Sequence, residues 1–133
     1  MKNFFAVDLG ATSGRTILAT FDGSRVHMQE VTRFANPMIP LGGHLYWAMA
    51  GLYNEVLRGL REVAAKGVAI DSIGIDTWGC DFAFFGADGQ LLGLPHCYRD
   101  QHTVGAQEQF FRHAHFRCHV AQAVPQLLQR VEL

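Results

Sequence analysis

Phosphate chemistry is suggested by one glycine-rich segment near the start of the chain. Asp8 ends a short hydrophobic run, and the segment Gly10-Ala11-Thr12-Ser13-Gly14-Arg15 follows it almost directly. Glycine lets backbone N–H groups turn toward an anion, and concave clusters of such N–H groups bind phosphate. The hydroxyls of Thr12 and Ser13 add hydrogen-bond donors, and the guanidinium of Arg15 can neutralise phosphate oxygens. The segment therefore favours a loop that holds phosphate.

Asp8 has a role in such a loop only if a cation accompanies the phosphate, because two negative groups repel each other. A Mg²⁺ ion between them, bound directly or through water, removes this conflict. The spacing matches neither the P-loop pattern G-x-x-x-x-G-K-[ST] nor the dinucleotide-binding pattern G-x-G-x-x-G. A glycine-rich hairpin with an exposed carboxylate and no ligand explains these residues about equally well.

A second segment carries residue types suited to binding a sugar. These are acceptors for hydroxyl groups, an indole and a glycine: Asp76, Thr77, Trp78, Gly79 and Asp81. An indole offers an apolar face to a sugar ring, and glycine lets a ligand approach the backbone. Ligands of α/β sheets commonly lie beyond the C-terminal ends of strands. The alternative is a strand end with a core tryptophan and solvated carboxylates, which these residues alone slightly favour.

The elements that would position both segments follow a β-β-β-α-β order. Hydrophobic alternation and turn residues predict an antiparallel meander of three strands, and a period near 3.6 predicts an amphipathic helix that Gly67 ends. The predicted strands cover residues 4–7, 16–21, 26–34 and 68–76, with a loop over 36–43 and the helix over about 47–66. A hairpin is predicted over 81–92 and a helix over 104–116. Phe82, Phe84 and Phe85 are expected in the core, and His44 at the surface.

Composition limits the classes of function. The chain has 133 residues, 11 Lys+Arg and 12 Asp+Glu, and 49% of its residues are hydrophobic. A net charge of −1 argues against a nucleic-acid partner held by bulk electrostatics. No apolar run approaches the roughly 18–20 residues of a membrane span. Asp8 would interrupt a signal-peptide core, and the three cysteines form no C-x-x-C pair, so a cytoplasmic protein is expected.

Together these motifs resemble the FGGY family of carbohydrate kinases, within the actin/Hsp70/hexokinase superfamily. The segments that carry the resemblance are residues 6–15, 33–36, 71–81 and 95–100. The resemblance implies an α/β, ribonuclease-H-like domain of the actin/hexokinase type. Residues 1–111 would form part of the N-terminal domain. Residues 112–133 would form an atypical tail, either truncated or frameshifted.

The resemblance also implies the site and the reaction. ATP phosphates would lie along Ala11, Thr12, Ser13, Gly14 and Arg15, while Asp8 would support Mg²⁺. Gly79 would contact the sugar, with Trp78, Asp81 and Tyr98 as neighbours. The implied reaction is the ATP-dependent phosphorylation of L-rhamnulose to L-rhamnulose 1-phosphate in rhamnose catabolism. The partners would be ATP and a small sugar, and nothing in the sequence indicates an oligomeric state.

Departures from the family pattern leave alternatives open. The family's catalytic base is an Asp preceded by His, and no His-Asp pair occurs in this sequence, so no turnover is expected from this chain alone. A non-catalytic nucleotide-binding or vestigial fragment, or a kinase for another ketose, remains a rival interpretation. Ala48 replaces the Asp that caps the long helix in the family. His113, His115, Cys118 and His119 are metal-ligand types, but their spacing matches no zinc pattern.

Overall fold

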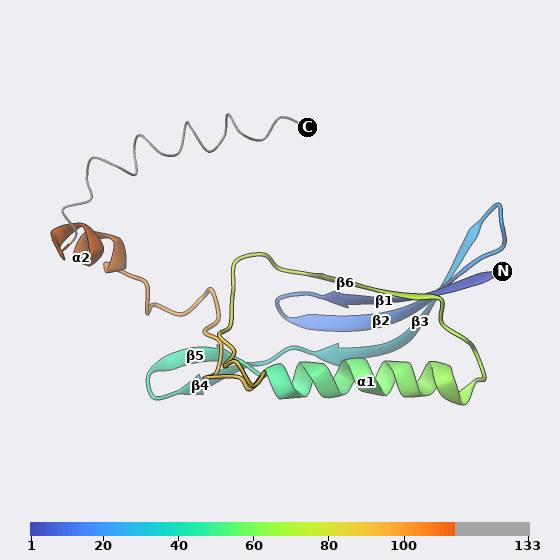
Figure 1. The fold of residues 1–133 in the computed structure, drawn as a ribbon, viewed down its shortest axis with the longest axis horizontal. Helices are drawn as coiled ribbons and strands as arrows, with labels where there is room; N and C mark the ends of the chain where they lie inside the picture. The colour runs from blue at the N-terminus through green and yellow to red at the C-terminus, as the bar shows by residue number, and fades with distance from the viewer. Residues whose placement is uncertain (114–133) are drawn as a thin grey trace. The chain divides into compact units, whose positions relative to one another are not determined.

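A computed structural model describes residues 1–113 and divides the chain into two compact units, Met1–Asp100 and Gln101–Leu133 (Figure 1). The second unit contributes helix α2, Ala106–His113, which confirms part of the helix predicted over 104–116. His115, Cys118 and His119 lie outside the described residues. No helix among residues 1–113 is long and apolar enough to cross a membrane.

The main sheet of the first unit has the strand order β3-β2-β1-β6. Its strands are β1 (Lys2–Leu9), β2 (Ser13–Phe21), β3 (Val26–Ala35) and β6 (Ser72–Thr77). β2 pairs antiparallel with both β1 and β3, whereas β6 pairs parallel with β1. The antiparallel meander and the β-β-β-α-β order are therefore confirmed.

Alternation along the strands decides which side chains face helix α1. Phe5 and Val7 on β1 and Leu18 on β2 are buried with Val63 of α1 in one core cluster. Successive side chains of a strand point to opposite faces of the sheet. Asp8, one residue after Val7, therefore points to the face away from α1.

Helix α1, Met49–Ala65, covers strands β2 and β3 (Figure 1). It ends where Gly67 adopts a φ of +70°, a conformation that glycine accepts without steric cost. At its start, Ala48 is the N-cap and makes no side-chain hydrogen bond, as the sequence departure predicts. Near its middle, Gly59 lies so close to β2 that a Cβ there would be 2.4 Å from Thr16 Oγ1.

A short hairpin replaces the loop predicted over residues 36–43. Strands β4 (Met38–Leu41) and β5 (His44–Trp47) form a separate two-stranded antiparallel sheet. Gly42 and Gly43 have φ values of +58° and +83°, as a two-residue hairpin turn with positive φ at both positions requires. The loop prediction was wrong because proline, though unable to donate a ladder hydrogen bond, is tolerated in an edge strand.

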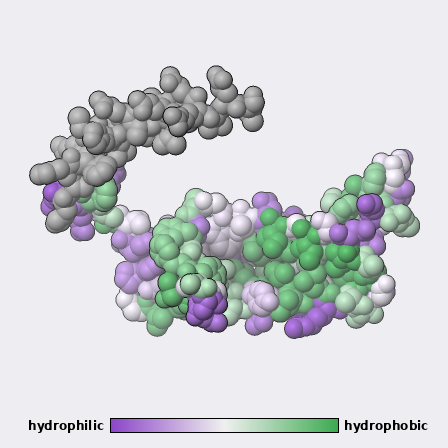
Figure 2. Space-filling model, viewed as in Figure 1, coloured by the Kyte–Doolittle hydropathy of each residue, from purple (hydrophilic) through white to green (hydrophobic). Residues whose placement is uncertain are grey.

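The expectation that Phe82, Phe84 and Phe85 belong to the core is wrong. Their exposed fractions are 68%, 69% and 62%. The predicted 81–92 hairpin is present as one bridge, between Phe85 and Leu91, with hydrogen bonds from Gly86 N–H to Gln90 O and from Leu92 N–H to Phe84 O. On β6, Ile73 and Ile75 are also exposed. Their register places them beside Phe5 and Val7, yet α1 lies over β2 and β3 rather than over β6. Figure 2 shows hydrophobic surface over this part of the first unit.

Replacing Gly59 by alanine is expected to destabilise the fold, although alanine is the better helix former. The added methyl group would meet the buried Thr16 side chain, and overpacking costs about 1–3 kcal/mol. Gly51→Ala is the matched control, because a Cβ there lies 3.6 Å from the Ala48 Cβ, which is ordinary contact. That control should gain about 0.5–1 kcal/mol. Urea unfolding measures both changes, and an equal gain from both variants would contradict the close packing.

Restoring an N-cap is expected to stabilise helix α1. Ala48→Asp and Ala48→Asn each supply an oxygen that can accept a hydrogen bond from the first helical turn, for about 1 kcal/mol. Ala48→Leu adds no acceptor and should give no such gain. Thermal unfolding of the three variants is the measurement. If leucine stabilises as much as aspartate does, capping is not the cause.

Candidate functional site

Three carbonyl groups of the turn between β1 and β2 accept hydrogen bonds from the protein itself. Gly10 N–H donates to Ser13 O at 2.9 Å, Asn36 N–H donates to Thr12 O at 2.9 Å, and Asn36 Nδ2 donates to Gly10 O at 2.9 Å. Among residues 1–113, no acceptor is found for the N–H groups of Ala11 and Thr12. The turn therefore offers two backbone donors to an anion. Asn36, 3% exposed, belongs to a segment that carries the family resemblance, but its anchoring role was not predicted.

Both glycines of this segment are required by packing, and neither has a positive φ. A Cβ on Gly10 would lie 2.9 Å from Ser13 O. A Cβ on Gly14 would lie 2.4 Å from the ring of Phe34, on the neighbouring strand β3. The glycines thus keep the turn close to its own backbone and to the adjacent strand.

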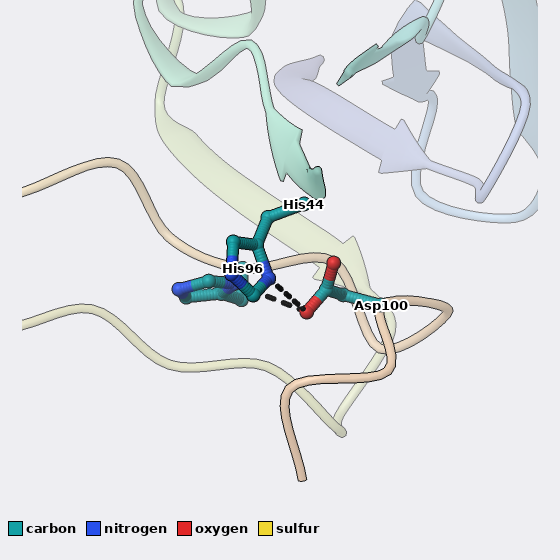
Figure 3. A group of neighbouring side chains, drawn as sticks. All are labelled: His44, His96 and Asp100. Atoms are coloured by element: carbon teal, nitrogen blue, oxygen red, sulfur yellow. Dashed lines mark hydrogen bonds and ion pairs between the residues drawn. The ribbon is translucent and has the colours of Figure 1, made fainter. Parts of the chain in front are cut away.

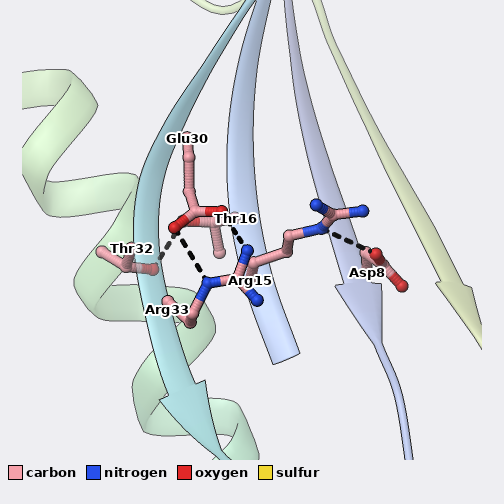
Figure 4. A network of polar contacts seen from close by, with 6 residues as sticks. All are labelled: Asp8, Arg15, Thr16, Glu30, Thr32 and Arg33. Atoms are coloured by element: carbon pink, nitrogen blue, oxygen red, sulfur yellow. Dashed lines mark hydrogen bonds and ion pairs between the residues drawn. The ribbon is translucent and has the colours of Figure 1, made fainter. Parts of the chain in front are cut away.

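Asp8 and Arg15 form an ion pair on the face of the sheet opposite α1 (Figure 4). Arg15 Nε donates to Asp8 Oδ2 at 2.9 Å, and the two side chains are 44% and 43% exposed. Such a pair is weakly held in solvent, so both groups remain accessible to a ligand.

A second ion pair stands next to the first. Arg33 is the register partner of Arg15 on β3, and its guanidinium binds both carboxylate oxygens of Glu30. The hydrogen bond from Arg33 lowers the pKa of Glu30, and the hydrogen bond to Glu30 raises the pKa of Arg33. Both groups are therefore charged near neutral pH, and this face presents two guanidinium groups beside the turn.

Asp8 and Asp76 are register partners in the parallel pair β1–β6. Paired residues of adjacent strands share a face, so the two carboxylates project from the same side at the carboxyl ends of their strands. Mg²⁺ binds one or two carboxylates together with water and substrate phosphates. These two residues therefore fit such an ion. Asp76 was selected from the sequence as a sugar acceptor, and its register makes it a neighbour of Asp8.

Asp81 holds two indole rings together. Its Oδ2 accepts hydrogen bonds from Trp47 Nε1 at 2.5 Å and from Trp78 Nε1 at 2.6 Å. The two indole ring centroids are 4.4 Å apart, and the ring of Tyr98 lies 6.2 Å from that of Trp47. Three residues expected to neighbour the sugar, Trp78, Asp81 and Tyr98, are thus brought together.

Trp47 is the member of this cluster that sequence reasoning missed. It is 1% exposed and lies at the end of β5, just before helix α1. The signal available in the sequence was a tryptophan directly before the helix cap. Gly79 follows Trp78 and has open space around the position of a Cβ, so a ligand could approach its backbone. Within the described residues, no donor is bonded to Asp81 Oδ1, which remains an acceptor for a hydroxyl group.

The turn and the aromatic cluster, which consists of Trp47, Trp78 and Tyr98 around Asp81, begin at neighbouring points of the sheet. Leu9 and Thr77, the last residues of β1 and β6, are register partners in the parallel pair. Gly10 and Trp78 follow them directly. The parallel pairing therefore brings a phosphate-type turn and a sugar-type cluster to one edge of the sheet.

The same fold occurs in solved sugar kinases. Gluconate kinase from Lactobacillus acidophilus superposes with a TM-score of 0.66 at 18% identity, covering 84% of this chain and 23% of that protein. Xylulose kinase from the same organism superposes with a TM-score of 0.60 at 18% identity, covering 84% of this chain and 24% of that protein. The fold is therefore the ribonuclease-H-like α/β fold of the FGGY sugar kinases.

The sequence is similar to rhamnulokinases. The chain is 56% identical over 110 residues to a rhamnulokinase from Bacteroides thetaiotaomicron, covering 83% of this chain and 23% of the relative. It is 44% identical over 107 residues to a rhamnulokinase from Pectobacterium atrosepticum, covering 79% of this chain and 22% of the relative. The chain thus spans about a quarter of the length of these relatives. No protein-family model matches it. The resemblance to the FGGY carbohydrate kinases is confirmed.

Removing the Asp81 carboxylate is expected to disturb both indole rings. Asp81→Ala leaves two partly buried N–H donors without their acceptor, at a cost of about 1–3 kcal/mol. Trp47 and Trp78 are the two tryptophans of the chain, so tryptophan emission reports this cluster directly. We expect a shifted emission maximum and a lower urea midpoint. Asp88→Asn, a change at an exposed turn, is the control, and a similar spectral shift there would contradict the assignment.

Proposed function

We propose that this chain supplies the phosphate-binding and sugar-binding edge of an ATP-dependent kinase that converts L-rhamnulose to L-rhamnulose 1-phosphate. The observation that carries the proposal is the register pairing of Leu9 with Thr77, which starts both binding segments from one sheet edge. The choice of sugar is supported by the 56% identity to a protein named rhamnulokinase. The proposal places the reaction in the cytoplasm.

The phosphates of ATP would be held by the turn after β1. The N–H groups of Ala11 and Thr12, the hydroxyl of Ser13 and the guanidinium of Arg15 supply donors, and Gly14 keeps the turn against β3. Asp8 and Asp76 would hold Mg²⁺, which neutralises phosphate charge when bound. Phosphoryl transfer depends mainly on positioning and on stabilising charge, and these groups serve both purposes.

The sugar would lie against the aromatic cluster. Asp81 Oδ1 would accept a hydrogen bond from a sugar hydroxyl, while the indole of Trp78 would pack on the ring. Gly79 would offer its backbone, and Tyr98 its hydroxyl. The carboxylate of Asp81 is oriented by its two indole donors before a sugar arrives, so little ordering is needed on binding.

Phosphoryl transfer to the sugar also requires a base that takes the proton of the sugar hydroxyl group. In the family that base is an Asp preceded by His, and this sequence contains no such pair. We therefore propose that this chain binds both substrates and does not turn them over. With purified chain, ATP, Mg²⁺ and L-rhamnulose, ADP formation should stay at background. Turnover that disappears in Asp8→Asn would overturn the assignment of the base.

Binding tests the proposal directly. Calorimetric titration of the full chain with Mg·ATP should give binding that weakens about 10-fold or more in Arg15→Gln, since a charge-assisted hydrogen bond is worth about 1.5–3 kcal/mol. Arg25→Gln removes an exposed charge at the β2–β3 turn and should leave the affinity unchanged. If the affinity falls equally in both variants, the effect comes from the loss of one positive charge anywhere on the chain, and Arg15 does not contact the phosphates.

A ketose panel tests the choice of sugar. L-rhamnulose should change tryptophan emission at lower concentration than D-xylulose or D-fructose, and the change should be lost in Asp81→Ala. Tighter binding of another ketose would favour a kinase for that sugar. Binding of Mg·ATP without any ketose would favour the nucleotide-binding fragment, and no binding of either would favour the vestigial fragment.

A further inference from the structure

Two histidines and one carboxylate converge away from the proposed substrate site. His44 Nδ1 lies 3.1 Å from Asp100 Oδ1, and His96 Nδ1 lies 3.4 Å from the same oxygen (Figure 3). One ligand atom from each residue lies within 4.8 Å of the other two. His44 was expected as a surface histidine, and its side chain is 44% exposed, but it is also bonded to a carboxylate that is 3% exposed.

The backbone around these residues fixes their relative positions. Residues 95–97 run along β5, with Trp47 N–H donating to Pro95 O at 3.0 Å and Cys97 N–H donating to Leu45 O at 2.9 Å. This pairing sets His96 opposite β5, the strand that begins with His44. The second oxygen of Asp100 accepts the Leu45 N–H at 2.6 Å, which orients the carboxylate and leaves Oδ1 toward both imidazoles.

Two of the three distances between ligand atoms match the edges of a tetrahedral metal centre, and the third, between the two imidazole nitrogens, is at most 4.8 Å. Ligand atoms that are each about 2.0–2.1 Å from a tetrahedral metal lie about 3.3–3.4 Å from one another. The two nitrogen-to-oxygen separations of 3.1 and 3.4 Å fall close to that edge length. A cation would replace the imidazole proton that now bonds Asp100, because metal binding takes the place of protons on its ligands.

The donor set selects the kind of cation. Two imidazole nitrogens and one carboxylate oxygen suit Zn²⁺ and similar first-row divalent ions, whereas Mg²⁺ and Ca²⁺ prefer all-oxygen sites. The side chains of His44 and His96 are 44% and 33% exposed. An ion can therefore enter from solvent and keep a water molecule as its fourth ligand. The hydrogen bond from Leu45 N–H supplies the outer support that a ligating carboxylate needs.

We propose that His44, His96 and Asp100 form a binding site for Zn²⁺ or a similar divalent ion, which fastens the segment 95–100 to the start of β5. The site lies outside the turn and the aromatic cluster, so it does not depend on the proposed kinase function. The bound ion would hold in place the loop that carries Tyr98.

Zinc titration of the full chain tests this site. The tail could also bind zinc, so the titration is made in a background with His113→Ala, His115→Ala, Cys118→Ser and His119→Ala. We expect one zinc per chain in this background, and binding at least 10-fold weaker in His44→Ala and in His96→Ala. His27→Ala, which removes an exposed histidine of β3, is the matched control and should leave the affinity unchanged.

Two further readouts separate a metal centre from a structural role of the histidines. Zinc should raise the melting temperature of the background chain but not that of His44→Gln, a variant that keeps a polar side chain. X-ray absorption at the zinc edge should report two imidazoles and oxygen ligands. Absence of binding at one equivalent, or equal affinity in the His44 and His27 variants, would overturn the proposal. So would zinc ligands that contain sulfur.

Discussion

Helix α1 can lie against the sheet only because residue 59 has no side chain. Below Gly59, Thr16 of β2 and Thr32 of β3 are buried, and their hydroxyl oxygens are 2.6 Å apart. One hydroxyl donates to the other, so both buried oxygens take part in a hydrogen bond at the contact. The helix is thereby fixed over β2 and β3 at one point along its length. Its first turn follows Trp47 in the chain, so this contact also limits where the aromatic cluster can lie.

The parallel pairing of β1 and β6 supplies the second constraint. The chain leaves β1, forms the meander and helix α1, and returns beside β1 more than sixty residues later. Parallel strands end at the same edge, so the segments that follow them must emerge together. In the proposed function, this is why the turn that begins at Gly10 and the aromatic cluster that begins at Trp78 could serve one reaction.

Sequence reasoning succeeded where local pattern decides structure. The meander and the long helix follow from alternation and from a 3.6 period, and Gly67 ends the helix as expected. It failed where distant packing decides. Phe82 and its neighbours look like core residues by composition, but no element of the described chain covers them. Pro40 suggests a loop, but an edge strand tolerates it.

The candidate site shows the same division. Residue types alone selected Asp8, Arg15, Trp78 and Asp81, and the structure places each of them at the sheet edge or in the cluster beside it. The pairing of Asp8 with Asp76 depends on strand register, because a shift of one residue would turn Asp76 to the opposite face of the sheet. Trp47 could not be assigned because its bond to Asp81 joins residues 34 positions apart.

The hairpin β4–β5 connects the aromatic cluster to the histidine cluster. Strand β5 begins with His44 and ends with Trp47, and residues 95–97 pair with the same strand. The ring of His96 packs on Tyr46 with centroids 4.5 Å apart, while Tyr98 lies near Trp47. The four residues of β5 therefore connect the two clusters directly. The position of Tyr98 beside the aromatic cluster therefore depends on the contacts that hold His96 and Asp100 against β5.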